Sequence, residues 1–485
     1  MKKLLKNKRL HLLLFFVATL SIFFSWYLFH LTEIPVFADE AIYLNWAQRI
    51  INGDENLFIS MYDGKPPLFM WLAGLSSLLF KDLLLAGRFV SVVSLFITTT
   101  LIIKNLKKKS VSWAYLALFA ILGNTFLFFY SRMALLDTLF SSLLILFIFS
   151  WSNNKSKYSG WLTGVFLSLA FLTKTPAVFL FPLPFITLLQ KRNKKTFINI
   201  AVVFSTLLLT LFVLKTSPWF PSLFSRSTDF TYKASDILSG HLSHIWPNLK
   251  TITGWLSFYL TWPLLLFSAL GAIKGFKEKN NLVINLFFAS LLFFLPLTIL
   301  GKIITSRYFL FLGFTLPILA SYYLSKIKTK YLLIIIATFL SITIPNNYQF
   351  QNNYFNSYLP KEDNGQYFRD WSSGIGLDHA SIFINQKAQN NKVLVLTEGT
   401  FGTLPDGLFV YQSRIGSLEN LEIVGVTSPE SNSYFKAIEK SNAKEIYYIG
   451  NHNRIQDNFR EKNTVVSSYA KKDEGPALEI IKISK

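Results

Sequence analysis

The chain contains no cysteine among its 485 residues, so a disulfide framework, a thiolate zinc site and a cysteine nucleophile are all excluded. A glycine-rich phosphate loop of the Walker type is also missing, which makes an ATP-type donor a poor fit. Acidic residues are scarce in one region only. Residues 1–345 hold 11 Asp and Glu against 33 Lys and Arg, whereas residues 346–485 hold 16 against 15. The formal charge of +21 therefore belongs to the first region.

Apolar residues, by contrast, are abundant. The chain is 51% hydrophobic and 16% aromatic, with a mean hydropathy of +0.37, and this composition predicts a polytopic α-helical membrane protein. The basic residues fall into short clusters between apolar runs, which is typical of cytoplasmic loops. We therefore expect a lipid bilayer around the chain and no nucleic-acid partner.

Apolar runs long enough to cross about 30 Å of hydrocarbon predict about eleven transmembrane helices. Their expected ranges are residues 10–31, 84–103, 111–130, 133–151, 159–173, 176–190, 197–214, 254–273, 282–300, 303–325 and 331–345. With the N-terminus in the cytoplasm, this layout satisfies the positive-inside rule and places residues 346–485 outside. A cleaved N-terminal signal peptide is the alternative, but the apolar run exceeds the usual core of about 7–15 residues. The expected location is the plasma membrane, as a multi-pass protein.

A long external loop, residues 32–83, follows the first predicted span. Residues Ala41–Gly53 show the pattern of an amphipathic helix. The apolar run from Pro66 is short, and a crossing there would move the Lys104–Lys109 cluster outside, so we predict a helix at the outer interface instead. Residues 1–345 then form the transmembrane catalytic domain.

Residues 346–485 predict a separate, small extracytoplasmic α/β domain. An Asn- and Tyr-rich linker opens it, and β-type runs then alternate with helical stretches. The predicted strands are KVLVLTEG, LEIVGV, EIYYIG and ALEIIKI, and SYFKAIEKSN is a predicted helix. This region shows no phosphate loop and no paired carboxylate or histidine motif, so we interpret it as a substrate-gripping or structural appendage.

Isolated ionisable residues of the apolar half all fall at the outer membrane face in this layout. They are Asp39, Glu40, Lys65, Arg88, Arg132, Asp137, Lys174, Lys302 and Arg307. Each has an ordinary structural explanation: Asp39 or Glu40 can cap the helix that follows, and Arg88 or Lys302 can snorkel to the interface. Their clustering on one face, however, favours a functional site, because charges beside hydrocarbon are costly.

An outward-facing site beside hydrocarbon suits an amphipathic substrate such as a polyprenyl-phosphate sugar. Its tail stays in lipid, and lysine or arginine can hold the phosphate as it leaves. A carboxylate can remove the proton from an acceptor that attacks the anomeric carbon. With one base and no covalent intermediate, this reaction inverts the configuration at that carbon.

The motifs resemble those of the GT-C superfamily of membrane glycosyltransferases. The similarity is to the protein O-mannosyltransferase and aminoarabinose-transferase group, which uses polyprenyl- or dolichyl-phosphate sugars. It rests on ADEAIYLNWAQRIINGD, DGKPPLFMWL, AGRFVSVV, SRMALLDTLF, LSLAFLTKTPAVFLFPLP and SRYFLFLGFTLP, which cover about the first 320 residues in this order. The stretch before KPP is shorter than is usual in that group.

This resemblance implies roles for particular residues. Asp39 would be the general base, with Glu40 beside it, and Asp137 a second essential acid. The implied contacts to the donor phosphate are Lys65, Arg132, Lys174, Arg307 and Tyr308. The acceptor, whether protein, lipid or cell-envelope glycan, would be extracytoplasmic.

Two questions stay open at this point. A divalent cation could bind at Asp39, Glu40 and Asp137, whose oxygens are hard ligands, although Lys65 and Arg132 favour charge neutralisation without a metal. The alternative function is a membrane transporter or lipid flippase with an outward-facing charged cavity. Such a protein should carry charges near the bilayer midplane and broken helices in matching halves, which the sequence does not indicate.

Overall fold

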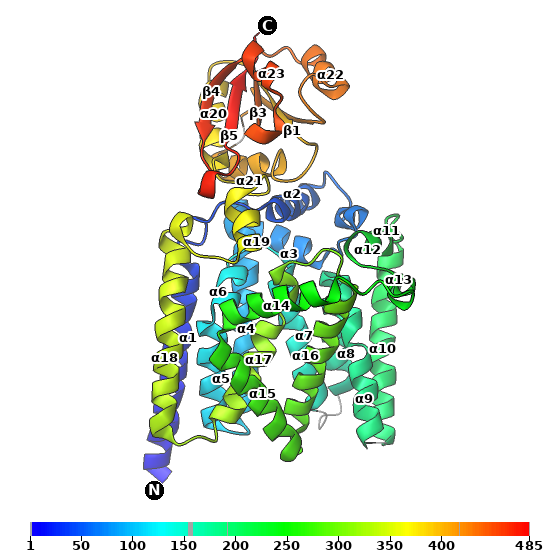
Figure 1. Cartoon of the computed structure of the whole chain (residues 1–485), viewed down its shortest axis with the longest axis vertical. Helices are drawn as coiled ribbons and strands as arrows, with labels where there is room; N and C mark the ends of the chain where they lie inside the picture. The colour runs from blue at the N-terminus through cyan, green and yellow to red at the C-terminus, as the bar shows by residue number, and fades with distance from the viewer. Residues whose placement is uncertain (1, 154–158, 192, 417, 485) are drawn as a thin grey trace. The chain divides into compact units, whose positions relative to one another are not determined.

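The computed structural model describes residues 2–153, 159–191, 193–416 and 418–484. They form two compact units, which are described separately below (Figure 1). The first unit comprises Met1–Leu31, Ser60–Leu68 and Phe89–Asn352, and the second comprises Thr32–Ile59, Phe69–Arg88 and Asn353–Lys485. This division differs from the expected 1–345 and 346–485, because most of the predicted first external loop groups with the C-terminal region.

The first unit is helical. Its elements are α1 (Lys2–Leu28), most of α4 (Leu83–Lys107), α5 (Val111–Gly123), α6 (Thr125–Ser131), α7 (Leu136–Ser152), α8 (Ser159–Thr173), η2 (Thr175–Leu180), α9 (Pro182–Lys191), α10 (Lys194–Lys215), α11 (Ser222–Ser225), α12 (Ser227–Phe230), α13 (Ala234–Leu238), α14 (Ile245–Leu260), α15 (Trp262–Lys277), α16 (Asn281–Leu300), η3 (Ser306–Phe309), α17 (Leu312–Leu324) and α18 (Thr329–Asn352).

Among the described residues, four helices are long and apolar enough to cross a membrane: α1, α4, α10 and α16. The number rises to six if the bent pairs α5–α6 and α14–α15 each count as one span, and five further apolar helices are shorter. The chain is thus a polytopic membrane protein. All eleven predicted runs are largely helical, but a count of about eleven crossings stays a prediction.

Two of the predicted spans are broken rather than continuous. The run 111–130 bends by 56° at Asn124, whose side chain donates to the carbonyls of Ala120 and Ile121 and accepts from the Leu127 N–H. The predicted span 254–273 bends by 101° at Thr261. Thr261 has φ +68°, and Pro263 lacks the N–H that a continuous helix needs. The predicted run 254–273 is therefore covered by two helices, α14 and α15, rather than by one continuous helix.

The second unit combines helices with one sheet. Its elements are α2 (Ala38–Asn52), most of α3 (Leu68–Ser77), η4 (Tyr354–Asn356), α19 (Lys361–Asn364), η5 (Gly365–Arg369), α20 (Leu377–Ala388), β1 (Val393–Glu398), α21 (Asp406–Ile415), β2 (Leu421–Val426), α22 (Asn432–Lys440), β3 (Glu445–Asn451), η6 (His452–Arg454), α23 (Asp457–Lys462), β4 (Thr464–Tyr469), η7 (Lys472–Glu474) and β5 (Leu478–Lys482); η1 (Ile59–Asp63) lies almost entirely in the first unit. The two helices predicted in the first external loop are α2 and α3.

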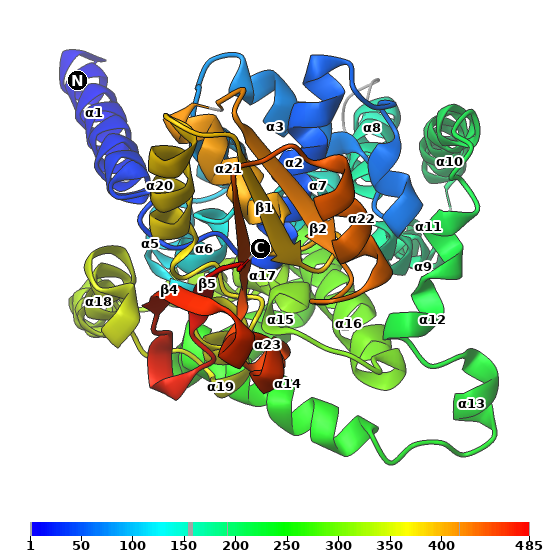
Figure 2. The same ribbon diagram turned by 90° about the horizontal axis from the view of Figure 1, so that it is seen from above.

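The sheet confirms the predicted α/β domain. Its strand order is β2-β1-β3-β5-β4, with β1 parallel to β2 and β3, and β5 antiparallel to its neighbours. Figure 2 shows α20 and α21 on one side of β1 and β2, and α22 on the other. The core under α22 and α23 includes Leu394, Leu396 and Tyr448. The sequence missed β4, a largely exposed edge strand whose residues lack the apolar run of the other four.

Two helices run past their predicted limits. Helix α18 continues through Pro345 to Asn352, so the first residues of the predicted linker are helical. A proline inside a helix loses one backbone hydrogen bond but need not end it. Near its C-terminal end, the Gln351 side chain donates to the carbonyl oxygens of Trp26 and Phe29 at 2.8 and 2.7 Å, which attaches α18 to the end of α1.

Candidate active site

A cavity of about 310 Å³ opens within the helical unit. Its walls are mostly apolar and include Phe140, Phe179, Phe293 and Leu297. Its polar lining is a small set of charged and hydroxyl side chains from separate parts of the chain: Asp63, Lys65, Lys174, Thr175, Arg226, Thr231 and Tyr308. A largely apolar pocket with a few convergent polar groups is the usual form of a binding or active site.

Lys65 reaches the cavity from a tight turn after η1. Gly64 has φ +72°, a left-handed conformation that strains other residues, and its missing Cβ would lie 3.2 Å from the Ser222 carbonyl oxygen. The Lys65 N–H donates to the Ser60 carbonyl (3.1 Å), and the Ser60 hydroxyl donates back to the Lys65 carbonyl (2.9 Å). The Lys65 ammonium lies 5.4 Å from the centre of the Phe230 ring. The turn therefore fixes the backbone and leaves the charge at the cavity.

Lys174 places a second positive charge at the cavity, where two other predicted site residues contact it. Its ammonium donates to the Asp137 carboxylate at 2.6 Å and lies 4.4 Å from the centre of the Tyr308 ring. Asp137 is in the first turn of α7, where the helix dipole favours a negative charge. The positive charges of Arg307 and Lys65 also act on Lys174. Five of the predicted site residues are therefore gathered around this cavity.

The remaining cavity wall comes from the segment after α10. Arg226 pairs with Asp63, beside the Lys65 turn, and with Asp229 at 3.2 Å. The Tyr232 N–H donates to the Leu300 carbonyl at 2.8 Å, so this segment is attached to the end of α16. Sequence reasoning missed Arg226 entirely. Asp63 stood inside the DGKPP motif, but nothing at the sequence level indicated its distant partner.

Arg132 has a different environment from the other predicted phosphate contacts, and it is not among the described residues that line the cavity. Its guanidinium donates to the carbonyl oxygens of Tyr27, Phe29 and His30 at 2.8 to 2.9 Å, and the side chain is fully buried. These carbonyls end α1, where a cation is favoured by the helix dipole. This geometry supports an anchoring role for Arg132 and gives no support to the predicted phosphate contact.

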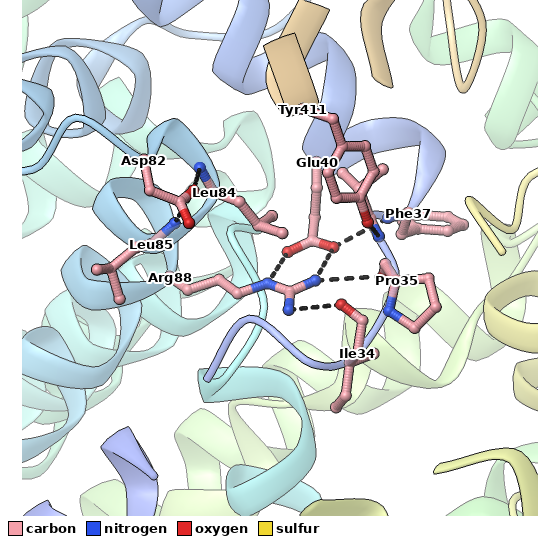
Figure 3. A network of polar contacts seen from close by, with 10 residues as sticks. Ile34, Pro35, Phe37, Glu40, Asp82, Leu84, Leu85, Arg88 and Tyr411 are labelled. Atoms are coloured by element: carbon pink, nitrogen blue, oxygen red, sulfur yellow. Dashed lines mark hydrogen bonds and ion pairs between the residues drawn. The ribbon is translucent and has the colours of Figure 1, made fainter. Parts of the chain in front are cut away.

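Asp39 and Glu40 belong to the second unit, at the start of α2. Both Glu40 oxygens are engaged by Arg88: Nε donates to Oε1 and Nη2 to Oε2, each at 2.9 Å (Figure 3). Arg88 also donates to the carbonyls of Ile34 (2.8 Å) and Pro35 (3.2 Å), and both charged side chains are fully buried. The interpretation of Arg88 as a snorkelling residue is therefore wrong.

This pair fixes the chain just before Asp39. Glu40 Oε2 also accepts from the Phe37 N–H at 3.0 Å, as a capping carboxylate does. The Tyr411 hydroxyl accepts from the Val36 N–H at 3.3 Å. Asp39 itself is partly exposed, next to a residue whose side chain is fully buried. Adjacent positions on a helix point about 100° apart, so the two carboxylates lie on different faces of α2.

Two of the three carboxylates proposed as metal ligands are already matched to cations. Glu40 is paired with Arg88 and Asp137 with Lys174. Within the described part of the chain, no group of three or more His, Cys, Asp or Glu side chains could hold a metal ion. A divalent cation at Asp39, Glu40 and Asp137 stays a prediction without support from this geometry.

Comparisons with known proteins bear on the whole arrangement. Residues 64–219 match the family model described as dolichyl-phosphate-mannose-protein mannosyltransferase. No curated protein matches the chain. ArnT from Cupriavidus metallidurans, solved bound to undecaprenyl phosphate, has a TM-score of 0.58 at 11% identity, over 97% of this chain and 98% of that one.

Two archaeal structures are also similar. The oligosaccharyltransferase of Archaeoglobus fulgidus in the apo form has a TM-score of 0.54 at 9% identity, over 90% of this chain and 69% of that one. AglB from the same organism, in complex with an inhibitory peptide and a dolichol-phosphate, has a TM-score of 0.51 at 10% identity, over 89% and 69%. Identities this low show a shared fold.

The fold is therefore that of the GT-C membrane glycosyltransferases. The resemblance to this superfamily, predicted from the sequence motifs, is confirmed by the family match and the similar folds. The segment that matches the family model begins at Gly64 and includes Lys65 and Lys174, which line the cavity, and Asp137, which pairs with Lys174.

Proposed function

We propose that this protein is an inverting glycosyltransferase that moves a sugar from a polyprenyl-phosphate donor to an extracytoplasmic acceptor. The observation that carries the proposal is the cavity itself. Two lysines, an arginine paired with Asp63, a tyrosine and two threonines face a space whose other walls are mostly phenylalanine, leucine and isoleucine. A ligand that suits it has an anionic group and a hydrocarbon chain.

The donor phosphate would bind between Lys65 and Lys174. An ammonium bound to Asp137 is held in place, and charge-assisted hydrogen bonds to phosphate are about twice as strong as neutral ones. As the glycosidic bond breaks, negative charge grows on the leaving phosphate, and fixed cations stabilise that transition state more than the ground state. Tyr308 adds a hydroxyl at the same wall.

The polyprenyl chain would lie along the apolar wall formed by Phe293, Leu297 and Leu300 of α16. Both undecaprenyl phosphate and dolichol-phosphate appear in structures of similar fold. These carriers share the phosphate and isoprenoid chemistry that the cavity suits. The similarity supports a lipid-phosphate donor and leaves the sugar undefined.

Asp39 would act as the general base. It accepts the proton from the acceptor hydroxyl or amine, whose oxygen or nitrogen then bonds to the anomeric carbon while the bond to the phosphate breaks. Its support is the environment of α2: the neighbouring Glu40 is committed to Arg88, and Asp39 remains partly exposed on a fixed backbone. A fixed base contributes through orientation as well as proton transfer.

Full-length protein in liposomes, supplied with a panel of polyprenyl-phosphate hexoses and pentoses, tests the proposal. Envelope glycans from cells with and without the protein, compared by mass spectrometry, would identify the sugar and the acceptor. We expect transfer from one donor, and its loss in Asp39→Asn protein that still folds and inserts. Full turnover in that variant would refute Asp39 as the base, and no transfer from any lipid-phosphate sugar would refute the function.

A further inference from the structure

The loop 370–374 of the C-terminal domain pairs directly with the segment that precedes Asp39, and both lie in the second unit. The Ala38 N–H donates to the Ser372 carbonyl at 3.0 Å, and the Gly374 N–H donates to the Val36 carbonyl at 2.9 Å. Phe37 and Ser373 form an antiparallel bridge between them. The loop thus acts as a short strand partner for residues 36–38.

The loop 370–374 and the segment 36–38 approach each other closely enough to fix which of their residues pair. A Cβ on Gly374 would lie 2.3 Å from the Val36 carbonyl oxygen, so only glycine allows this approach. On the other side of the segment, the Phe37 ring lies 4.6 Å from the Tyr367 ring. A movement of the loop would therefore move the backbone that leads into α2.

One buried lysine holds the loop in place. The Lys471 ammonium donates to the carbonyls of Asp370 (3.0 Å) and Ser373 (2.9 Å) and to Asn451 Oδ1 (2.6 Å). Three N–H groups therefore meet three acceptors, and the residue is only 3% exposed. Such a fully satisfied buried network is rigid.

The anchor for this lysine is the carboxyl end of the sheet. Asn451 ends β3, and Glu398 ends its parallel neighbour β1. The Asn451 N–H donates to Glu398 Oε2 at 2.8 Å, and its amide nitrogen donates to Oε1 at 2.5 Å. A continuous series of hydrogen bonds therefore connects β1 and β3, through Lys471 and the loop 370–374, to Ala38.

We propose that Lys471 is a positioning residue for sugar transfer, which holds the Asp39 carboxylate in place through the loop 370–374 and the segment 36–38. This inference rests on the proposed role of Asp39 as base. It gives the C-terminal domain a mechanical part in the reaction, because a base displaced by about 1 Å can lose about 10²-fold in rate. Lys471 touches no reacting atom in this account.

The charge state of Lys471 gives a readout that a purely structural lysine would not. Burial lowers its pKa to about 8, against the opposing charges of Glu398 and Asp370, while Arg454 adds to the lowering. A neutral amine has two N–H groups for three acceptors, so one hydrogen bond is lost above that pH. The wild-type transfer rate should therefore show an alkaline decline that a variant without a titrating group at position 471 lacks.

The test compares full-length Lys471→Met with Lys482→Met, a half-exposed lysine of β5 paired with Glu445. Amide hydrogen exchange is followed in peptides covering 34–40 and 368–376, and kcat and KM are measured against pH. In Lys471→Met we expect about tenfold faster exchange in both peptides, the order expected for loss of a charge-assisted hydrogen bond. We also expect a lower kcat with KM little changed, and no alkaline decline. Lys471→Arg should restore part of kcat, and Lys482→Met should match the wild type.

The positioning role is refuted if Lys471→Met exchanges at 34–40 as slowly as the wild type, or if it keeps the kcat and pH profile of the wild type. This holds even if Asp39→Asn is inactive. Asp39→Asn run in parallel tests the base assignment by itself. Retained turnover there, with faster exchange in Lys471→Met, would refute the base and still support the mechanical link from loop to segment.

Discussion

The two units hold their charged residues in different ways. In the helical unit, Lys65 and Lys174 line a cavity; the Phe230 ring lies near Lys65, and the Tyr308 ring and the Asp137 carboxylate lie beside Lys174. In the second unit, Arg88 and Glu40 are fully buried and satisfy each other and the backbone around them. All these residues are ionisable and sit next to apolar runs in the sequence. Burial and partners, rather than residue type, separate the charges that line the cavity from those enclosed in the second unit.

The largest expected effect is on stability, from Arg88→Met. It leaves the Glu40 carboxylate buried without its bidentate partner, which should cost about 3–5 kcal/mol of unfolding free energy. Thermal or denaturant unfolding of the detergent-solubilised protein measures this. The double variant Glu40→Met/Arg88→Met should recover most of the loss, because no charge is then stranded. If Arg88→Met unfolds like the wild type, the structural interpretation of this pair is wrong.

Lys65→Ala should show the opposite profile, with activity lost and stability kept. Removing one fixed cation from the leaving phosphate should lower kcat by about 10²–10³-fold. Lys302→Ala is the matched control, since Lys302 is exposed and does not line the cavity. Donor turnover and unfolding are measured on the wild type, Lys65→Ala and Lys302→Ala. Equal activity of the two variants would contradict the phosphate role of Lys65.

A double-mutant cycle on Asp137 and Lys174 tests an ion pair that shares features with both Lys65 and the Arg88–Glu40 pair. The pair is mostly buried yet borders the cavity. We expect a coupling energy of about 0.5–3 kcal/mol in stability from Asp137→Asn and Lys174→Met. Both single variants should also lose donor turnover. Additive stability effects would show that the ion pair contributes nothing to the fold.

A pH dependence of stability, of a size similar to that coupling, is expected in the second unit. Folded Lys471 releases its proton near pH 8, whereas the unfolded side chain keeps it up to about 10.5. Between these values the unfolded state binds more protons, so stability should rise with pH, by about 1 kcal/mol per unit from this group. Lys471→Met should show no such rise in stability. In the wild type, the added stability should be lost as the pH falls back to 8. Hydrogen exchange of β3 and β5 at several pH values would detect it.

Much of this arrangement was predictable from the sequence. Apolar runs predicted the helices and alternating runs predicted four of the five strands, because periodicity reports on local structure. The motif residues Lys65, Asp137, Lys174, Arg307 and Tyr308, which lie around one cavity, were grouped from their predicted membrane sidedness and from the resemblance to the GT-C group rather than from periodicity.

What the sequence did not indicate is mostly contacts between distant residues. The partners of Arg132, Arg88 and Arg226 depend on which backbone carbonyls or carboxylates the fold brings near. An arginine beside an apolar run looks the same in the sequence whether it binds phosphate or ends a helix. The exposed strand β4 was missed because its pairing with β5, not its own composition, makes it a strand.

The most direct test of the account is photo-cross-linking of a diazirine-bearing polyprenyl phosphate to the protein in liposomes, followed by peptide mapping. The account predicts labelling within the segments 293–304 and 174–179, which contribute residues to the cavity lining, and much weaker labelling in Lys65→Ala/Lys174→Met protein. Labelling elsewhere, or undiminished labelling in the double variant, would contradict the claim that these two lysines bind the donor phosphate.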